Sequence, residues 1–257
     1  PNRAEGGASL MILDELFQSI QSDAPITTVL MGIYWTVVAT PNGAGMAATF
    51  GNCKAHGEEK IRGVGTFEGM SARTLAEFAY SENHLEASLG IAALNALLCP
   101  AGPVGVELNA FHVLADWGRE KRVAMVGHFP FAEKLRARVG ELMILEINPD
   151  EGDYPAEMAG QIIPTASVVA ITGSTLINHT LDNLLKLCNP NARVIIMGPS
   201  TPLSPVLLAH GVDIISGVQI TDLASVIRTI GQGATFQQVE GVRLVTLDAE
   251  HHITGKA

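Results

Sequence analysis

The chain has 257 residues, of which 47% are hydrophobic and 16% are charged, a composition typical of a folded protein with a large core. Its formal net charge is −10 with only 16 Lys and Arg residues, so we expect neither a nucleic-acid partner nor an anionic membrane surface. The three cysteines are scattered along the chain, which excludes a disulfide framework. No apolar run reaches about 18 residues and no signal-peptide core is present, so we expect a cytoplasmic protein without membrane spans.

The first predicted elements are a short helix and two strands. Residues 13–20 carry apolar side chains at the spacing of one helical face. Residues 29–40 alternate as a strand, and a turn rich in Gly, Pro and Asn leads to a second strand at 46–50. The glycine-rich sequence at 51–65 predicts a mobile loop and a candidate lid.

Two helices are expected next. Ser71 can cap the first, which runs to about residue 80, and Asn83 can cap the second, over 85–98. Glu86 lies three residues after Asn83, at the capping-box position.

The second of these helices carries a polar stripe on an otherwise apolar sequence. His84, Ser88 and Asn95 share one face, which lies toward either solvent or a polar cleft. A further short helix is expected at 109–117. Strands followed by helices without alternation predict a small α+β domain over residues 1–118.

From residue 119 to 257, strands and helices alternate. Such alternation predicts a doubly wound parallel sheet with right-handed crossovers, so the fold class is α/β, with the small α+β domain preceding this sheet. We expect strands at 123–127, 142–147, 167–172, 193–198, 212–215 and 239–247, and helices at 133–139, 181–188, 206–210 and 223–230.

Glycine and hydroxyl residues recur where three of these strands end. The carboxyl ends of parallel strands form the edge at which ligands bind in open α/β sheets, and small residues let a ligand approach backbone N–H groups. The three ends predict a ligand site. Its candidate ligand-binding residues are Gly127, Pro130, Thr172, Gly173, Ser174, Gly198, Pro199, Ser200 and Thr201, with His128 at the mouth.

No familiar cofactor motif accompanies these strand ends. The dinucleotide fingerprint and the Walker A loop are absent, and Pro130 removes a backbone donor from the first turn. Glu146 follows at the distance of a ribose-binding acid, or is a surface acid at a strand end. His128 either acts as acid, base or ligand, or bonds a nearby loop. No histidine pair forms a metal motif, so neither the metal nor the cofactor can be named.

Several segments resemble a prokaryotic protein family. They are HLEASLGIAALNAL at 84–97, VGHFP at 126–130, EGDYP at 151–155 and GPSTPLSPVLLAHGVDIISG at 198–217. The family was catalogued as a domain of unknown function and is labelled for heavy-metal chelation. The resemblance implies an enolase-N-terminal-like domain fused to a Rossmann-like domain.

The resemblance also implies a site in the cleft between these domains. By matching positions it nominates Glu86 and Asn95 from the helix, and Asp153 and Tyr154 from the EGDYP loop. From the strand ends it nominates Gly127, His128, Pro130, Gly198, Pro199 and Thr201.

Two functions remain open, besides a scaffold with a relic cleft. The first is binding of a small organic ligand or metal complex, such as a pterin- or siderophore-like chelator. The second is an enzyme of the transferase or hydrolase class, with His128 or Glu86 as acid or base and S-adenosylmethionine held through Glu146. The apolar content is compatible with a homodimer.

Overall fold

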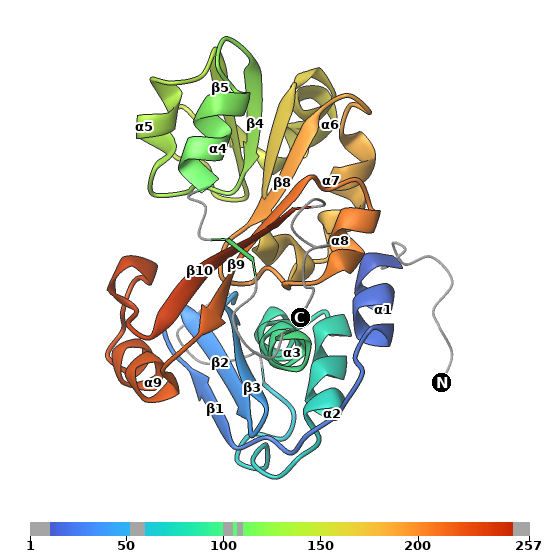
Figure 1. Cartoon of the computed structure of the whole chain (residues 1–257), viewed down its shortest axis with the longest axis vertical. Helices are drawn as coiled ribbons and strands as arrows, with labels where there is room; N and C mark the ends of the chain where they lie inside the picture. The colour runs from blue at the N-terminus through green and yellow to red at the C-terminus, as the bar shows by residue number, and fades with distance from the viewer. Residues whose placement is uncertain (1–10, 52–59, 100–104, 107–109, 249–257) are drawn as a thin grey trace.

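The computed structural model describes residues 11–51, 60–99, 105–106 and 110–248. It contains a three-stranded sheet of order β1-β2-β3 and a seven-stranded sheet of order β10-β9-β8-β7-β4-β5-β6. The two sheets occupy opposite ends of an elongated molecule, and β9 and β10 reach from the large sheet toward the small one (Figure 1). The predicted α/β fold class, a small α+β part followed by a mostly parallel sheet, is confirmed.

The small sheet is an antiparallel meander. Its strands are β1 (Thr28–Met31), β2 (Trp35–Thr40) and β3 (Gly43–Ala48). The prediction of one strand over 29–40 is wrong, because the chain turns back at Gly32, whose N–H donates to Trp35 O at 2.8 Å. A Cβ on Gly32 would lie 2.7 Å from Ile230 Cγ2, so this hairpin fits only because a glycine faces Ile230.

Helices cover one face of the small sheet. They are α2 (Ala72–Ala76), the 3₁₀ segment η1 (Glu77–Tyr80) and α3 (His84–Leu98). Ser71 and Asn83 cap α2 and α3 as predicted, each accepting backbone N–H bonds. Gly45 of β3 packs directly on the α3 backbone with no room for a Cβ, which makes the contact between strand and helix unusually close.

The large sheet is parallel except at one edge. Its strands are β4 (Arg122–Val126), β5 (Glu141–Glu146), β6 (Tyr154–Pro155), β7 (Val168–Thr172), β8 (Arg193–Met197), β9 (Ile214–Ile220) and β10 (Val242–Asp248). The last strand runs antiparallel to β9, so the expectation of a wholly parallel sheet is wrong there. The strand order reverses between β4 and β7, and such a reversal is where open α/β sheets bind ligands.

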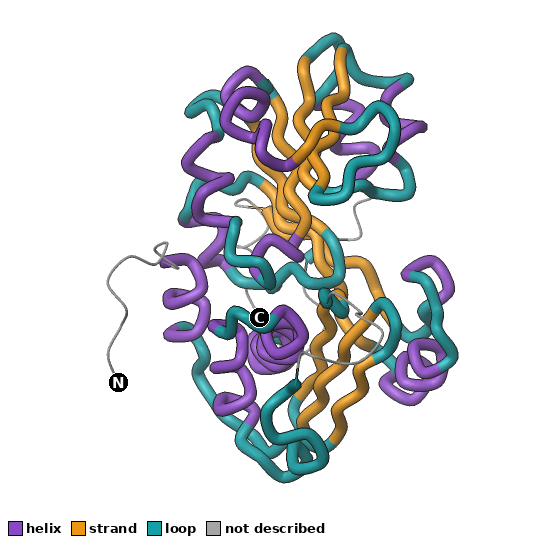
Figure 2. The backbone as a smooth tube through the Cα atoms, turned by 180° about the vertical axis from the view of Figure 1, so that it is seen from behind, coloured by secondary structure: helices purple, strands orange, loops and turns teal. Residues whose placement is uncertain are grey.

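Helices lie on both faces of the large sheet (Figure 2). Alternate strand residues point to opposite faces, so Met125 packs with Leu114 and Leu135 while Ala124 packs in the core that holds Leu184. One group is α4 (Ala110–Trp117) and α5 (Ala132–Arg136), and the other is α6 (Ala159–Ile162), α7 (Leu181–Leu187) and α8 (Pro205–Ala209). Short 3₁₀ segments are η2 (Ala156–Met158), η3 (Ile163–Thr165), η4 (Gly173–Leu176) and η5 (Phe236–Gln238).

The first and last described helices each pack on the other half of the chain. Helix α1 (Met11–Gln18) lies against α7 and α8, where the Ile12 N–H donates to Asp182 and His210 Nε2 lies 2.9 Å from Glu15 Oε2. Helix α9 (Leu223–Gly231) packs Ile230 into a buried cluster with residues of β2 and β3. These contacts bind the two halves together. Among the described residues, no helix has the length and apolar content needed to cross a membrane.

Candidate functional site

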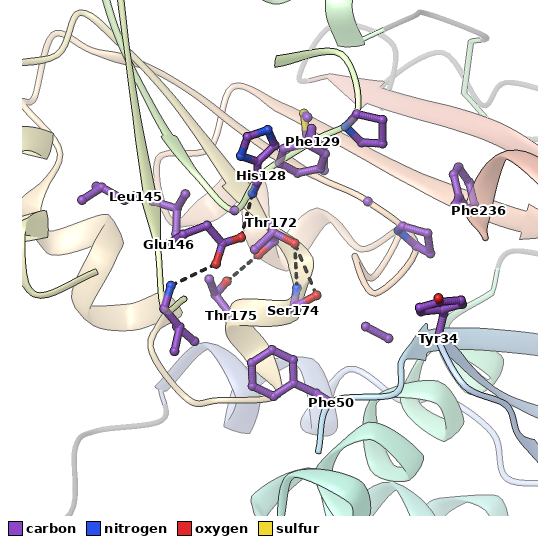
Figure 3. Close-up of a pocket in the computed structure, with 18 of the residues that line it drawn as sticks. Tyr34, Phe50, His128, Phe129, Leu145, Glu146, Thr172, Ser174, Thr175 and Phe236 are labelled. Carbon is purple, nitrogen blue, oxygen red and sulfur yellow. Dashed lines mark hydrogen bonds between the residues drawn. The ribbon is translucent and has the colours of Figure 1, made fainter. Parts of the chain in front are cut away.

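A cavity of about 810 Å³ opens where the carboxyl ends of β4, β5, β7 and β8 meet the small sheet. Both halves of the chain line it, and Figure 3 shows part of its wall. This cavity lies at the reversal of strand order, so it occupies the position predicted for a ligand. The predicted ligand residues that line it are Gly127, His128, Pro130, Glu146, Thr172, Ser174, Gly198 and Pro199.

The backbone turns sharply at two of these strand ends. Gly127 has φ +97° after β4, and Gly198 has φ +111° after β8. Both angles lie in the region that glycine adopts without steric cost. The turns carry the chain away from the sheet edge and leave room for the cavity.

Glu146, at the end of β5, is held in place by two backbone amides. Its Oε1 accepts the N–H of His128 at 2.8 Å and its Oε2 accepts the N–H of Ile147 at 2.9 Å. These bonds tie the ends of two neighbouring strands to one carboxylate, which lines the cavity (Figure 3).

Hydroxyl groups of the segment after β7 add to the polar wall. Thr172 Oγ1 accepts the N–H of Ser174 at 3.3 Å, and Thr175 Oγ1 donates to Thr172 O at 2.7 Å. Ser174 and Asn178 also line the cavity, so this strand end supplies small hydrogen-bonding groups as predicted.

Aromatic side chains from both halves of the chain form another part of the wall. It includes Tyr34 and Trp35 from the β1–β2 hairpin and Phe50 after β3. Phe129 stacks on Phe131 with ring centroids 5.6 Å apart, and Trp35 meets Phe236 edge to face at 5.6 Å. These rings give the cavity a mainly apolar surface.

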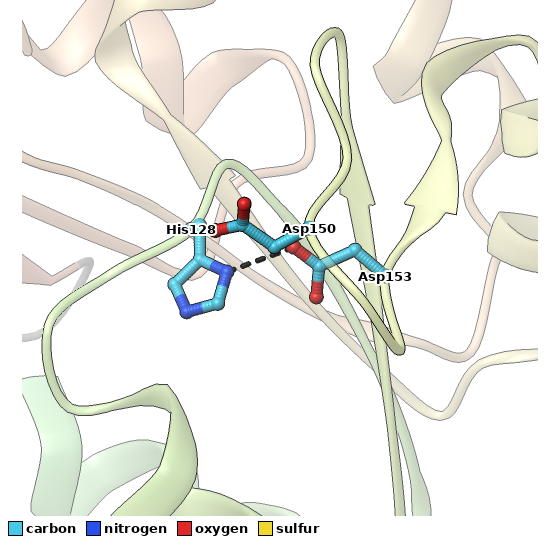
Figure 4. Close-up of side chains that lie close together, drawn as sticks. All are labelled: His128, Asp150 and Asp153. Carbon is cyan, nitrogen blue, oxygen red and sulfur yellow. Dashed lines mark hydrogen bonds and ion pairs between the residues drawn. The ribbon is translucent and has the colours of Figure 1, made fainter.

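His128, which lines the cavity, also belongs to a group of three potential metal ligands (Figure 4). His128 Nδ1 is 2.8 Å from Asp153 Oδ2, and the ligand atoms of His128, Asp150 and Asp153 all lie within 4.8 Å of one another. The Asp153 side chain is only 3% exposed, whereas that of His128 is 34% exposed. The VGHFP and EGDYP segments therefore meet in space.

The acidic loop after β5 folds so that its two aspartates converge. The Asp153 N–H donates to Asp150 O at 3.0 Å, and Gly152 between them has φ +94°. A glycine at this place in a β-turn allows the tight reversal. Asp150 was missed in the sequence analysis, although its place beside Asp153 in an acidic loop was a usable signal.

Several predicted ligand residues instead join the two halves of the chain. Asn95 Nδ2 donates to Met46 O at 2.9 Å and to Ser200 O at 3.2 Å, and Ser200 Oγ accepts the Ala48 N–H at 2.9 Å. Thr201 packs its backbone against Gly173. None of Asn95, Gly173, Ser200 and Thr201 lines the main cavity, and Tyr154 lies outside it in the short strand β6.

Glu86 is also not brought to the cavity. Its buried carboxylate accepts bonds from the Arg62 guanidinium at 2.8 to 3.0 Å and from Ser81 Oγ at 2.7 Å. The hydrogen bond from Arg62 is the main cause that lowers the pKa of Glu86 to about 2. The capping-box bond to Asn83 is replaced by these contacts, because the Asn83 N–H donates to Ser81 Oγ.

Arg62 anchors the described end of the predicted lid, residues 60–65, to the rest of the chain. Residues 52–59 lie outside the described residues, but Arg62 is fixed by Glu86 and its guanidinium lies 4.6 Å from the centre of the Phe78 ring. Residues 60–65 do not line the cavity.

Two sequence profiles match the chain. One spans residues 109–247 and belongs to DUF364, described as “Putative heavy-metal chelation”, and the other spans residues 13–98 and belongs to DUF4213, which has the same description. A search of curated proteins gives no match.

Two solved structures share the fold over nearly the whole chain. One is a DUF364 family protein of unknown function from Desulfitobacterium hafniense, with 29% identity, 92% coverage of this chain, 96% coverage of that chain and a TM-score of 0.78. The other is a DUF364 family protein of unknown function from Pyrococcus horikoshii, with 21% identity, coverages of 93% and 98%, and a TM-score of 0.75.

Proposed function

The chain belongs to the DUF364 family, labelled for heavy-metal chelation, and we propose that it binds a small organic ligand or a metal complex in its main cavity. The metal would be held by His128, Asp150 and Asp153. The observation that carries this proposal is the convergence of these three side chains, with ligand atoms within 4.8 Å of one another, beside a cavity of about 810 Å³.

The chemistry of the three side chains favours a borderline divalent metal. Imidazole suits zinc, copper, iron and nickel, and carboxylates suit harder cations, whereas soft metals prefer thiolates. The described cysteines, Cys99 and Cys188, lie outside the cluster. Burial raises the pKa of Cys99 and raises that of Cys188 to about 11, so both remain neutral thiols at pH 7. Capture of a bare thiophilic metal through these thiols is therefore disfavoured.

Three protein ligands leave coordination positions for a second molecule. A metal bound by one imidazole and two carboxylates keeps at least one open position in a tetrahedral site. His128 belongs to both the cluster and the cavity wall, so a chelating molecule in the cavity could complete the metal's coordination. A metal complex fits this arrangement better than a bare ion.

Calorimetry with Zn²⁺, Ni²⁺ and Co²⁺ tests this proposal on the full chain. We expect Asp153→Asn and His128→Ala each to weaken binding at least about tenfold, since losing one ligand removes a charged or imidazole donor. Asp116→Asn is the matched control, because Asp116 is exposed on α4, lies near Arg119 and is not one of the three cluster residues. No heat with any of the metals, or equal affinity in all four proteins, would refute the metal site.

A second candidate, an enzyme of the transferase or hydrolase class, is favoured by the His128–Asp153 contact. A buried carboxylate hydrogen-bonded to an imidazole orients the ring, as in many general acid–base pairs. Melting curves with S-adenosylmethionine, NAD and nucleotides test this candidate. A cofactor that raises the melting temperature supports it, and unchanged melting with all of them argues against it.

A further inference from the structure

Glu146 has an orientation that the backbone alone sets. Its two oxygens accept the N–H groups of His128 and Ile147, at the ends of adjacent strands, at 2.8 and 2.9 Å. No side-chain donor is needed to hold it. The carboxylate therefore presents the same pair of oxygens to the cavity whether or not a ligand is bound.

This carboxylate has hydrogen-bonding capacity that the protein does not use. A carboxylate offers about four acceptor positions, and only the two backbone bonds occupy them in the described part of the chain. Among the described residues no Lys or Arg forms an ion pair with Glu146, and Lys134, the cation that lines the cavity, is exposed on α5. A partly buried carboxylate without a cation favours ligand groups that donate hydrogen bonds.

Aromatic rings face the same space. Phe50 and Phe129 line the cavity with Glu146 (Figure 3), and Tyr34 and Phe236 extend this wall. Aromatic side chains favour flat ring systems, which pack in offset or edge-to-face arrangements. The cavity thus offers aromatic side chains on which a flat ring can pack, together with the two acceptor oxygens of Glu146.

We propose that Glu146 recognises a planar ring compound whose edge carries two adjacent hydrogen-bond donors. This inference rests on the proposed function, since it names the class of organic ligand that the cavity holds. Two kinds of compound share the required edge: an aromatic ring with neighbouring hydroxyl groups, and a ring that bears an amidine or a comparable pair of N–H groups. A ring with a carboxylate at that edge is excluded by repulsion from Glu146.

Binding of small ring probes to the metal-free full chain tests the inference. The probes are catechol and benzamidine, with 1,2-dimethoxybenzene and benzonitrile as partners of similar shape that lack the donors. We expect at least one donor probe to bind about tenfold or more tightly than its partner, measured by NMR titration, because hydrogen bonds to a charged group discriminate strongly. Which donor probe binds distinguishes the two kinds of compound.

Glu146→Gln should remove this preference, since the amide replaces one acceptor by a donor. Glu141→Gln is the control, because Glu141 begins the same strand and pairs with Arg122 at the other end of the sheet, and we expect it to keep the preference. Equal binding of donor probes and their partners, no binding of any donor probe, or an unchanged preference in Glu146→Gln would overturn the inference.

Metal binding measured on the same variants separates this inference from the proposed function. We expect Asp153→Asn to lose zinc binding but to keep the preference for donor probes, because Asp153 does not line the cavity. If zinc fails to bind wild type but the probes discriminate, the metal site fails alone. If zinc binds at the cluster but the probes do not discriminate, the Glu146 inference fails alone.

Discussion

Glu86 shows how a candidate catalytic acid can be wholly occupied by structure. Its carboxylate accepts bonds from the Arg62 side chain and backbone and from Ser81, and it does not line the cavity. Sequence could place Glu86 near the start of a helix. It could not reveal Arg62, which lies 24 residues earlier in a loop without periodicity.

Replacing Glu86 with Gln should lower the free energy of unfolding by about 2 kcal/mol at pH 7. This loss is small for a buried charge pair, because the Arg62 side chain is largely exposed. The pKa of Glu86 is lowered from 4.5 to about 2, so its contribution is present above about pH 4.5. That contribution is lost as pH falls toward 2. Urea unfolding at pH 7 and pH 3 checks this, and a wild-type-to-variant difference that does not shrink at pH 3 would contradict it.

His128 is the residue whose role the structure sharpens most. Sequence left it between a functional group and a hydrogen bond to a loop. The His128 ring is hydrogen-bonded to Asp153 of the EGDYP loop. This contact brings His128 close to Asp150 as well, and the three residues form the group of potential metal ligands. The two readings therefore describe the same interaction, because the loop that His128 contacts carries the acidic side chains.

At the scale of elements, the contact between β3 and the loop after β8 explains why predicted ligand residues lie away from the cavity. Ser200 is 2% exposed and its Oγ accepts the Ala48 N–H at 2.9 Å. Asn95 of α3 donates to backbone oxygens on both sides of this contact. Some of the residues at these strand ends thus line the cavity, and others, such as Ser200, join the two halves of the chain.

Ser200→Ala should lower the free energy of unfolding by about 1–2 kcal/mol, because the Ala48 N–H loses its acceptor at a poorly accessible position. Zinc and probe binding should stay within about twofold of wild type. Thermal and urea unfolding with calorimetry check both parts. A variant with full stability but weakened ligand binding would show that Ser200 contacts the ligand directly.

Sequence predicted β4, β5, β7 and β8 to within about one residue at each end, because each is a short apolar run bounded by Gly, Pro or charged residues. It placed β9 at 212–215, whereas the strand is Ile214–Ile220, and it missed the two-residue strand β6. It failed at the β1–β2 hairpin, since alternation continues through Gly32 and no standard two-residue turn marks the reversal. The error hid Tyr34, which lies at the hairpin tip, and Trp35, which begins β2, because both were expected inside one continuous strand. Phe50 and Phe236 were missed because their positions depend on how the halves pack.

At the scale of the whole molecule, the helices near both ends of the described chain cross between its halves. Helix α1 packs on α7 and α8, and α9 packs on the small sheet. One large buried cluster includes residues from Ile12 to Leu247. We therefore expect the two halves to unfold together.

Trp35 begins β2 of the small sheet and Trp117 ends α4, which packs on the large sheet, so each tryptophan can report separately on unfolding. With either tryptophan replaced by Phe, fluorescence and circular dichroism should give coincident urea transitions. Ile230→Ala, which removes a fully packed side chain between α9 and the small sheet, should lower the free energy of unfolding by about 2–4 kcal/mol. Two separated urea transitions in the protein without the Ile230 substitution would show that the two halves unfold independently.

We propose that a metal and an organic ligand meet at His128, which belongs to both the metal-ligand group and the cavity wall. Anomalous X-ray diffraction from crystals grown with Zn²⁺ tests it most directly, with data collected on both sides of the zinc absorption edge. We predict one strong peak about 2 Å from a His128 ring nitrogen and from carboxylate oxygens of Asp150 and Asp153. A strong peak elsewhere, such as at His210 and Glu15, with none at His128, would show that zinc does not bind at His128, Asp150 and Asp153.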